Sequence, residues 1–127
     1  MPLESVFTEG APAPIGPYSQ ATISSGFLFC SGQIALDPAS GEIVTGDVSA
    51  QAEQVMRNLR GVLHAAGCDF GSVVKTTIFL VDMNDFAAVN AVYGKYFDAT
   101  KPARTTVAVA GLPRGSRIEI EAIARRD

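Results

Sequence analysis

Two glutamates near the end of the chain could carry acid–base chemistry. Residues 117–125 alternate in polarity, which predicts a β-strand with apolar side chains on one face and Glu119 and Glu121 on the other. We expect the apolar face to meet the helices, so the two carboxylates point to the opposite face, where burial is costly unless they are paired or functional. A solvated strand face, or a salt bridge between subunits to Arg104 or Lys75, would explain the same pattern.

Three further positions could contact a small ligand. Arg104 begins a strand-like segment, and its planar guanidinium suits a carboxylate through two parallel hydrogen bonds, although a surface arginine needs no ligand. Tyr18 places a hydroxyl at the end of a stiff proline-rich loop, either as a binding group or as an ordinary tyrosine. Gly32 follows Ser31 at the end of a strand, where it would either let a ligand approach the backbone or form a bulge.

The remaining reactive residue types give no metal or nucleotide signal. His64 is the only histidine and lies in a helical pattern, which favours a solvated position over a catalytic one. Cys30 and Cys68 form no Cys-x-x-Cys pair, so we interpret them as two buried thiols in a reducing compartment rather than as a disulfide or redox pair. The sequence contains no glycine-rich phosphate loop and no cluster with zinc spacing. We therefore expect neither a metal nor another cofactor.

The length, charge and hydrophobic content of the chain exclude several classes of protein. The chain has 127 residues, 47% of them hydrophobic, which is enough for the core of one domain. Its net charge of −3, from 10 basic and 13 acidic residues, argues against a dedicated nucleic-acid binder. Its apolar runs are far shorter than the roughly 20 residues of a membrane helix. The first residues lack the features of a signal peptide, so we expect a cytoplasmic protein without membrane contact.

Hydrophobic periodicity predicts the elements that must position these residues. An apolar stripe at helical spacing begins at Val48 and should end at Gly67, with Gln51 on its polar side. A second helix follows, capped by Asp82 or Asn84. Its expected buried face consists of Phe86, Val89, Tyr93, Tyr96 and Phe97. Strands are expected at residues 6–8, 20–24, 26–33, 73–81, 105–109 and 117–125. This order predicts an α+β fold with both helices on one face of a single sheet.

The strand predicted at residues 73–81 is apolar on both faces. Period two would place Val74 with Ile78 on one face and Val73 with Phe79 on the other. Two helices can cover only one face of the sheet, so the other needs a partner. We expect that partner to be further copies of this chain in a closed symmetric oligomer.

Several segments, in order and at matching spacing along nearly the whole chain, resemble the YjgF/RidA family of reactive-intermediate deaminases. The most specific of them are Ile15-Gly16-Pro17-Tyr18-Ser19-Gln20, Ser31-Gly32-Gln33-Ile34, Pro102-Ala103-Arg104-Thr105 and Ile118-Glu119-Ile120-Glu121-Ala122-Ile123-Ala124. The resemblance implies one chorismate-mutase-like α+β domain over residues 1–127. It also implies a homotrimer whose sheets line a central barrel, with three clefts between subunits.

The resemblance implies an enzyme that hydrolyses reactive 2-imino acids, such as 2-iminobutanoate and 2-iminopropanoate, to 2-oxo acids and ammonia. These imines form from enamines such as 2-aminoacrylate, which pyridoxal-phosphate enzymes release. The imine carbon is already electrophilic, so orientation and water activation suffice, and the deaminase itself needs no cofactor.

The matching motifs also imply roles for individual residues. Arg104 matches the arginine that binds the substrate carboxylate, and Glu119 matches the glutamate that activates the attacking water. Four further residues match positions that line or support the cleft: Tyr18, Ser31, Gly32 and Asn90. Many members have cysteine where this chain has Thr106. The contact expected there is made largely by backbone, so threonine should preserve it, while the substrate range stays open.

Three other functions fit parts of the sequence. A trimer that binds small 2-oxo acids as a sensor, without turnover, would use the same Arg104 pocket. An RNA-acting translation inhibitor, a role attributed to some relatives, is disfavoured by the acidic charge balance. A protein-protecting chaperone leaves no sequence signature that would identify it.

Overall fold

The computed structural model describes residues 3–126, so both ends of the predicted domain, residues 1–2 and 127, lie outside the described residues. The strands are β1 (Glu4–Val6), β2 (Ala21–Ser24), β3 (Phe27–Ile34), β4 (Val73–Leu80), β5 (Ala103–Ala108) and β6 (Ile118–Arg125). The helices are α1 (Val48–Ala65) and α2 (Phe86–Tyr96), and three 3₁₀ turns span Phe70–Ser72, Met83–Asp85 and Pro113–Gly115. Among the described residues, no helix has the length and apolar character needed to cross a membrane.

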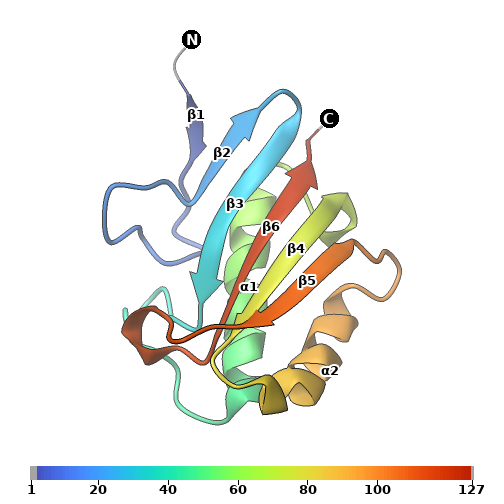
Figure 1. Ribbon diagram of the computed structural model, residues 1–127. Helices are drawn as coiled ribbons and strands as arrows, with labels where there is room; N and C mark the ends of the chain where they lie inside the picture. Colours follow the sequence, from blue (N-terminus) through green and yellow to red (C-terminus); the bar gives the residue numbers. More distant parts are fainter. Residues whose placement is uncertain (1–2, 127) are drawn as a thin grey trace.

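The six strands form one mixed sheet in the order β1-β2-β3-β6-β4-β5. Among the strands within residues 3–126, only β4 and β5 run parallel, and α2 makes the crossover between them. Both helices lie behind the sheet in Figure 1, so one face is covered and the other is not. The predicted α+β class, with two helices on one face of a sheet, is therefore confirmed. We call the uncovered side the open face.

The first strand and β5 both begin two residues earlier than expected because strand pairing decides where they lie, whereas the other four strands differ from the expected bounds by at most one residue at either end. The first strand was expected at residues 6–8, but pairing with β2 stops at Val6, and the backbone N–H of Thr8 instead donates to the Gln20 side chain at 2.7 Å. β5 begins at Ala103, two residues earlier than expected, because Ala103 already pairs with Lys75 of β4.

Helix α1 follows the predicted pattern at both ends. The Asp47 side chain accepts a hydrogen bond from the Ala50 backbone N–H at 3.0 Å, and Gly67 ends the helix with φ of +75°. His64 is exposed, as expected. Gln51, expected on the polar face, is instead buried, because its side-chain oxygen accepts from the backbone N–H of Arg117 at 2.8 Å.

The start of α2 differs from the prediction. The Asp82 side chain accepts from the Asn84 backbone N–H at 2.9 Å, and this bond caps the 3₁₀ turn rather than the α-helix. α2 begins one turn later, after Asp85, which makes no side-chain capping bond. Of the residues expected on its buried face, Val89, Tyr93 and Phe97 are buried, whereas Phe86 and Tyr96 are only half-buried.

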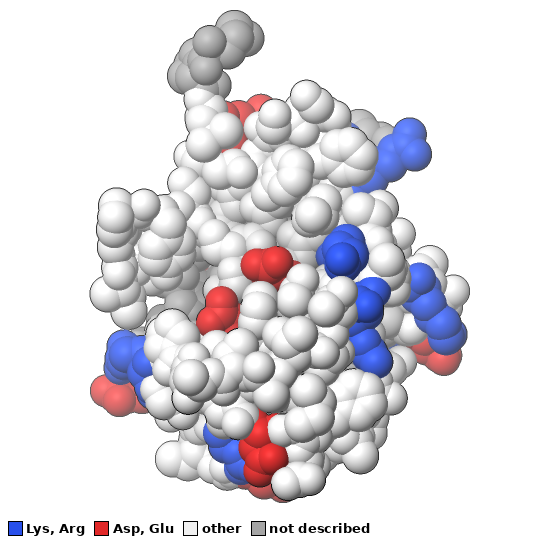
Figure 2. Space-filling view, in the orientation of Figure 1, with Lys and Arg blue, Asp and Glu red and all other residues white. Residues whose placement is uncertain are grey.

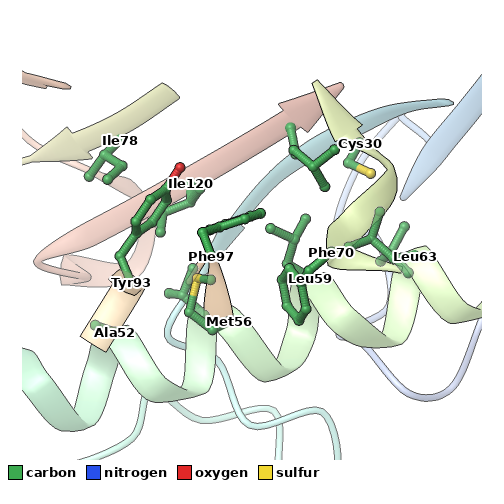
Figure 3. Packing of buried hydrophobic residues seen from close by; sticks show 14 of the residues in the cluster. Cys30, Ala52, Met56, Leu59, Leu63, Phe70, Ile78, Tyr93, Phe97 and Ile120 are labelled. Carbon is green, nitrogen blue, oxygen red and sulfur yellow. The ribbon is translucent and has the colours of Figure 1, made fainter. Parts of the chain in front are cut away.

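The core lies between the helices and the covered face of the sheet. Figure 3 shows α1 side chains such as Met56 and Leu59 packed toward the aromatic residues at the end of α2. Tyr93 and Phe97 have ring centroids 4.6 Å apart, and Phe97 meets Phe70 edge-on at 5.2 Å. Cys30 and Cys68 are both buried and no disulfide joins them, as expected. Burial, with a smaller contribution from Cys68, raises the pKa of the Cys30 thiol to about 12.

A β-bulge in β4 changes which face of the sheet its first residues occupy. Val73 pairs with Ala124 and Lys75 with Ile123, so Val74 is an extra residue opposite the β6 ladder. The prediction that Val74 shares a face with Ile78 was therefore wrong. Val73 is buried on the covered face, and Val74 is 42% exposed.

The open face is nonetheless apolar, as the sequence predicted. Figure 2 shows it as a mainly uncharged surface with acidic atoms near its centre and basic atoms beside them. Its large apolar side chains come from four neighbouring strands and are half-buried or exposed: Phe27, Phe29, Val74, Phe79, Val107 and Ile123.

Candidate functional site

Arg104 lies on the edge strand β5, on the covered face of the sheet. It pairs with buried Thr76 of β4, which directs its side chain toward α2. There the guanidinium carbon lies 5.4 Å from the ring centre of Phe86 and 5.0 Å from that of Tyr93. Its Nη1 donates a hydrogen bond to Oδ1 of Asn90 at 2.7 Å. An exposed and otherwise flexible side chain is thus held by two cation–π contacts and a hydrogen bond.

Tyr93, one of the aromatic residues that contact Arg104, is itself held by a hydrogen bond to the sheet. The Tyr93 hydroxyl shares a hydrogen bond of 2.7 Å with the hydroxyl of Thr76, which orients the tyrosine ring. Asn90 uses one of the five N–H donors that a guanidinium carries, so a second edge remains available for a planar anion. A hollow of about 450 Å³ adjoins the Arg104 side chain and is lined partly by Gly94, Phe97 and Pro102. This arrangement can bind a small carboxylate.

Glu119 lies on β6 and points to the opposite, open face. It pairs with Phe79 of β4 and with Ile34 of β3. The side chain is half-buried, and within residues 3–126 its carboxylate has no hydrogen-bond partner. Burial raises the pKa of Glu119 above its ordinary value, and the charge of Glu121 raises it further. A carboxylate of this kind can accept a proton from water and return it.

A bulge in β3 lies beside Glu119. Cys30 pairs with Ala122 and Gln33 with Ile120, so Ser31 and Gly32 together oppose a single residue of β6. The structure therefore shows the bulge that the sequence left as one of two possibilities for Gly32.

Ser31 fastens the proline-rich loop to the bulge. Its hydroxyl donates to the backbone carbonyl of Ser19 at 2.6 Å, and its backbone N–H donates to the backbone carbonyl of Gln20 at 2.9 Å. The buried Gln20 amide also donates to the backbone carbonyl of Pro12 at 2.8 Å. Tyr18 on this loop is 54% exposed. Together with Gly32 it lines a hollow of about 310 Å³, whose apolar wall includes Ile15, Ile34, Leu36 and Pro113.

The predicted site residues fall into two groups on opposite faces of the sheet. Arg104 and Asn90 form one group beside α2, together with Thr106, which is on the same face of β5 as Arg104. The Thr106 hydroxyl is buried and unpartnered within residues 3–126. The second group is Tyr18, Ser31, Gly32 and Glu119 around the β3 bulge. One copy of the chain therefore does not bring Arg104 and Glu119 to a common substrate.

The sequence-based interpretation missed the aromatic support of Arg104. Phe86, Asn90 and Tyr93 have spacings of four and three residues, so they share one face of α2. That spacing was visible in the sequence, but both aromatic residues were interpreted only as core. No sequence signal indicated that an arginine on β5 would lie over them. Among residues 3–126, no group of three or more His, Cys, Asp or Glu residues is placed to hold a metal ion.

The fold and the site define a class of α+β protein whose sheet carries a supported arginine on one face and a half-buried glutamate on the other. The family model for endoribonuclease L-PSP matches residues 8–126. The chain therefore belongs to this family, which is the YjgF/RidA family that its motifs resemble.

Named relatives are similar over nearly their whole length. A 2-iminobutanoate/2-iminopropanoate deaminase of Mus musculus is 56% identical over 119 residues, which are 94% of this chain and 88% of that protein. A RutC family protein of Pyrococcus horikoshii is 53% identical over 124 residues, which are 98% of both chains. The crystal structure of the YjgF gene product of E. coli is 49% identical with a TM-score of 0.92, covering 98% of this chain and 99% of that one.

Proposed function

We propose that this protein is a 2-imino acid deaminase that acts as a homotrimer, with each active site shared between two subunits. The observation that carries the proposal is the placement of Arg104 and Glu119 on opposite faces of one sheet. One small substrate can contact both only if the open face of one subunit lies against the β5 edge of the next. The deaminase name of the mouse relative supports the reaction, and the RutC name of the archaeal relative leaves it to be tested.

The apolar open face supports the assembly. Phe29 is 41% exposed there and Val107 is 37% exposed, within a patch shared by four strands. Such a patch is unfavourable in water, and a closed ring of identical copies would bury it without leaving an unpaired surface. The half-buried carboxylate of Glu119 would then lie at the subunit interface, near the Arg104 of its neighbour.

Arg104 would fix the position of the substrate. Its free guanidinium edge binds the carboxylate of the imino acid through two parallel hydrogen bonds. The reacting carbon is bonded directly to that carboxylate, so binding also positions the carbon and its imine nitrogen. Phe86 and Tyr93 hold the guanidinium plane before the substrate arrives. Less conformational freedom is then lost on binding.

Glu119 would move the proton. Water adds its oxygen to the carbon of the protonated imine while the Glu119 carboxylate accepts one of its protons, which gives a tetrahedral amino alcohol. The resulting carboxylic acid returns that proton to the amine nitrogen. The carbon–nitrogen bond then breaks, and after loss of the hydroxyl proton the products are a 2-oxo acid and ammonium. A raised pKa suits both steps, because the group must both accept and give up a proton near neutral pH.

The proposal is tested with imine generated freshly from an amino acid by a separate enzyme, with release of 2-oxo acid compared with the spontaneous rate. Glu119→Gln should keep pyruvate binding, because glutamine preserves the size but cannot accept the proton. Turnover should fall toward the spontaneous rate, by about 100-fold or more. Normal turnover in an intact trimer would show that Glu119 is only an interface group.

The same assay separates the deaminase from a non-catalytic sensor. Both would bind pyruvate through Arg104, but a sensor would release 2-oxo acid no faster than the spontaneous reaction. Wild-type protein that binds pyruvate without accelerating hydrolysis would therefore support the sensor and contradict the proposed enzyme.

A further inference from the structure

Gly32 lies directly against the carboxylate of Glu119. A Cβ atom built on Gly32 would lie 2.7 Å from Cδ and 2.9 Å from Cγ of Glu119, and closer still to Oε2. Real Cβ atoms do not approach other heavy atoms so closely. The Glu119 side chain thus occupies the space that any other residue at position 32 would fill.

The backbone of Gly32 does not itself require glycine. Gly26 and Gly67 adopt positive φ angles, where other residues are strained, whereas Gly32 is not among the glycines with positive φ. The β3 bulge also tolerates ordinary residues, as Ser31 shows beside it. What distinguishes Gly32 is the absence of a side chain at the point where Glu119 lies.

We propose that Gly32 is a positioning residue for Glu119. Because Gly32 has no side chain, it leaves a space on β3, which we call the seat, and the Glu119 carboxylate lies in this space. This inference rests on the proposed function for its catalytic consequence, but not for its geometry. Glu119 makes no hydrogen bond within residues 3–126, so contact with the seat is what restricts its orientation. Glu121 follows on the same face of β6, and its negative charge disfavours a rotation of Glu119 toward it.

Filling the seat should move Glu119 without unfolding the protein. The clash is with Oε2, Cδ and Cγ of a flexible side chain, which can move away from β3 by changing its rotamer. The carboxylate would then leave the position from which it activates water. Displacements of about 1 Å in an active site can cost about 100-fold in rate.

The direct experiment is Gly32→Ala, compared with Gly71→Ala as the matched control. Gly71 has open space around its Cβ position, lies outside both groups of site residues and is not among the positive-φ glycines. In Gly32→Ala we expect kcat to fall by about 10- to 100-fold, with pyruvate affinity, assembly and melting temperature close to wild type. Gly71→Ala should retain wild-type kcat. Unchanged kcat in Gly32→Ala would overturn the proposal.

A double-mutant cycle separates positioning from simple blockage of the pocket. If Gly32 acts through Glu119, adding Gly32→Ala to Glu119→Gln should change the residual rate by less than about twofold, because the proton acceptor is already lost. If the added methyl group instead blocks the substrate, it should weaken pyruvate binding by the same factor in both backgrounds. That second result would overturn the proposal.

The crystal structure of Gly32→Ala gives a readout that does not depend on activity. We expect the Glu119 carboxylate to be rotated away from β3 with the bulge preserved. A carboxylate at its original position would refute the seat even if the protein is a deaminase. A rotated carboxylate in a protein without deaminase activity would support the seat and refute only the proposed function.

Discussion

Mixed trimers provide the strongest test of a site shared between subunits. One parent carries Arg104→Lys and the other carries Glu119→Gln. Lysine keeps the charge of arginine but cannot make two parallel hydrogen bonds, and it has no flat surface to lie over Phe86 and Tyr93. We expect this substitution to cost about 2–4 kcal/mol in kcat/KM, or about 30- to 1000-fold. Each parent alone should therefore be almost inactive.

The expected recovery follows from the two faces of the sheet. In an equal, random mixture, half of the subunits retain Arg104 and half of their neighbours retain Glu119. If each site takes one residue from each of two subunits, about one quarter of the sites contain both residues. The unfractionated mixture should then show about a quarter of wild-type activity, and trimers that contain both parents should show about a third, because each has one complete site of three. If both residues came from one chain, no subunit would have a complete site.

The assay needs proof that the subunits have exchanged. The parents are co-expressed with different affinity tags, and trimers retained by both tags are purified. Light scattering should give three times the chain mass of 13.3 kDa, and imine hydrolysis is measured against the spontaneous rate. Doubly tagged trimers with no more activity than the parents would refute the shared site. A monomer at micromolar concentration would refute the assembly as well.

Three further outcomes follow from the contacts that hold Arg104 and from the charge around Glu119. Phe86→Leu keeps apolar volume but removes one aromatic face beneath the guanidinium, so pyruvate affinity measured by calorimetry should fall about two- to fivefold; unchanged affinity would show that this ring is only packing. Because Glu119 must be ionised to accept a proton and its pKa is raised, kcat should fall with decreasing pH at a value above its ordinary 4.5. Glu121→Gln removes a charge that opposes ionisation, so the acid limb of the kcat profile should move to lower pH. An acid limb that Glu121→Gln leaves in place would contradict this electrostatic account.

Much of the site was predictable because it depends on residues close together in the sequence. Alternation along β6 placed Glu119 and Glu121 on one face, since neighbouring side chains of a strand point in opposite directions. The apolar stripe of α1 and the family motifs likewise depend on short spacings. These patterns yielded the α+β class and the identity of the candidate residues.

Other features were decided only by pairing between distant segments. Val74 changed face because a bulge inserts one residue opposite β6, which the composition of β4 does not reveal. Gln51 is buried because Arg117, 66 residues away, presents an unpaired backbone N–H to it.

The division of the site between two faces is likewise a tertiary property. Each strand's alternation fixes which of its own residues share a face, but not how its faces match those of another strand. The register of β5, β4 and β6 sets that relationship, and it places Arg104 and Glu119 on opposite sides. The close approach of Gly32 to Glu119 depends on the same long-range pairing together with the β3 bulge. The sequence by itself determined which groups can perform the chemistry, whereas backbone hydrogen bonds between distant strands decided where those groups lie.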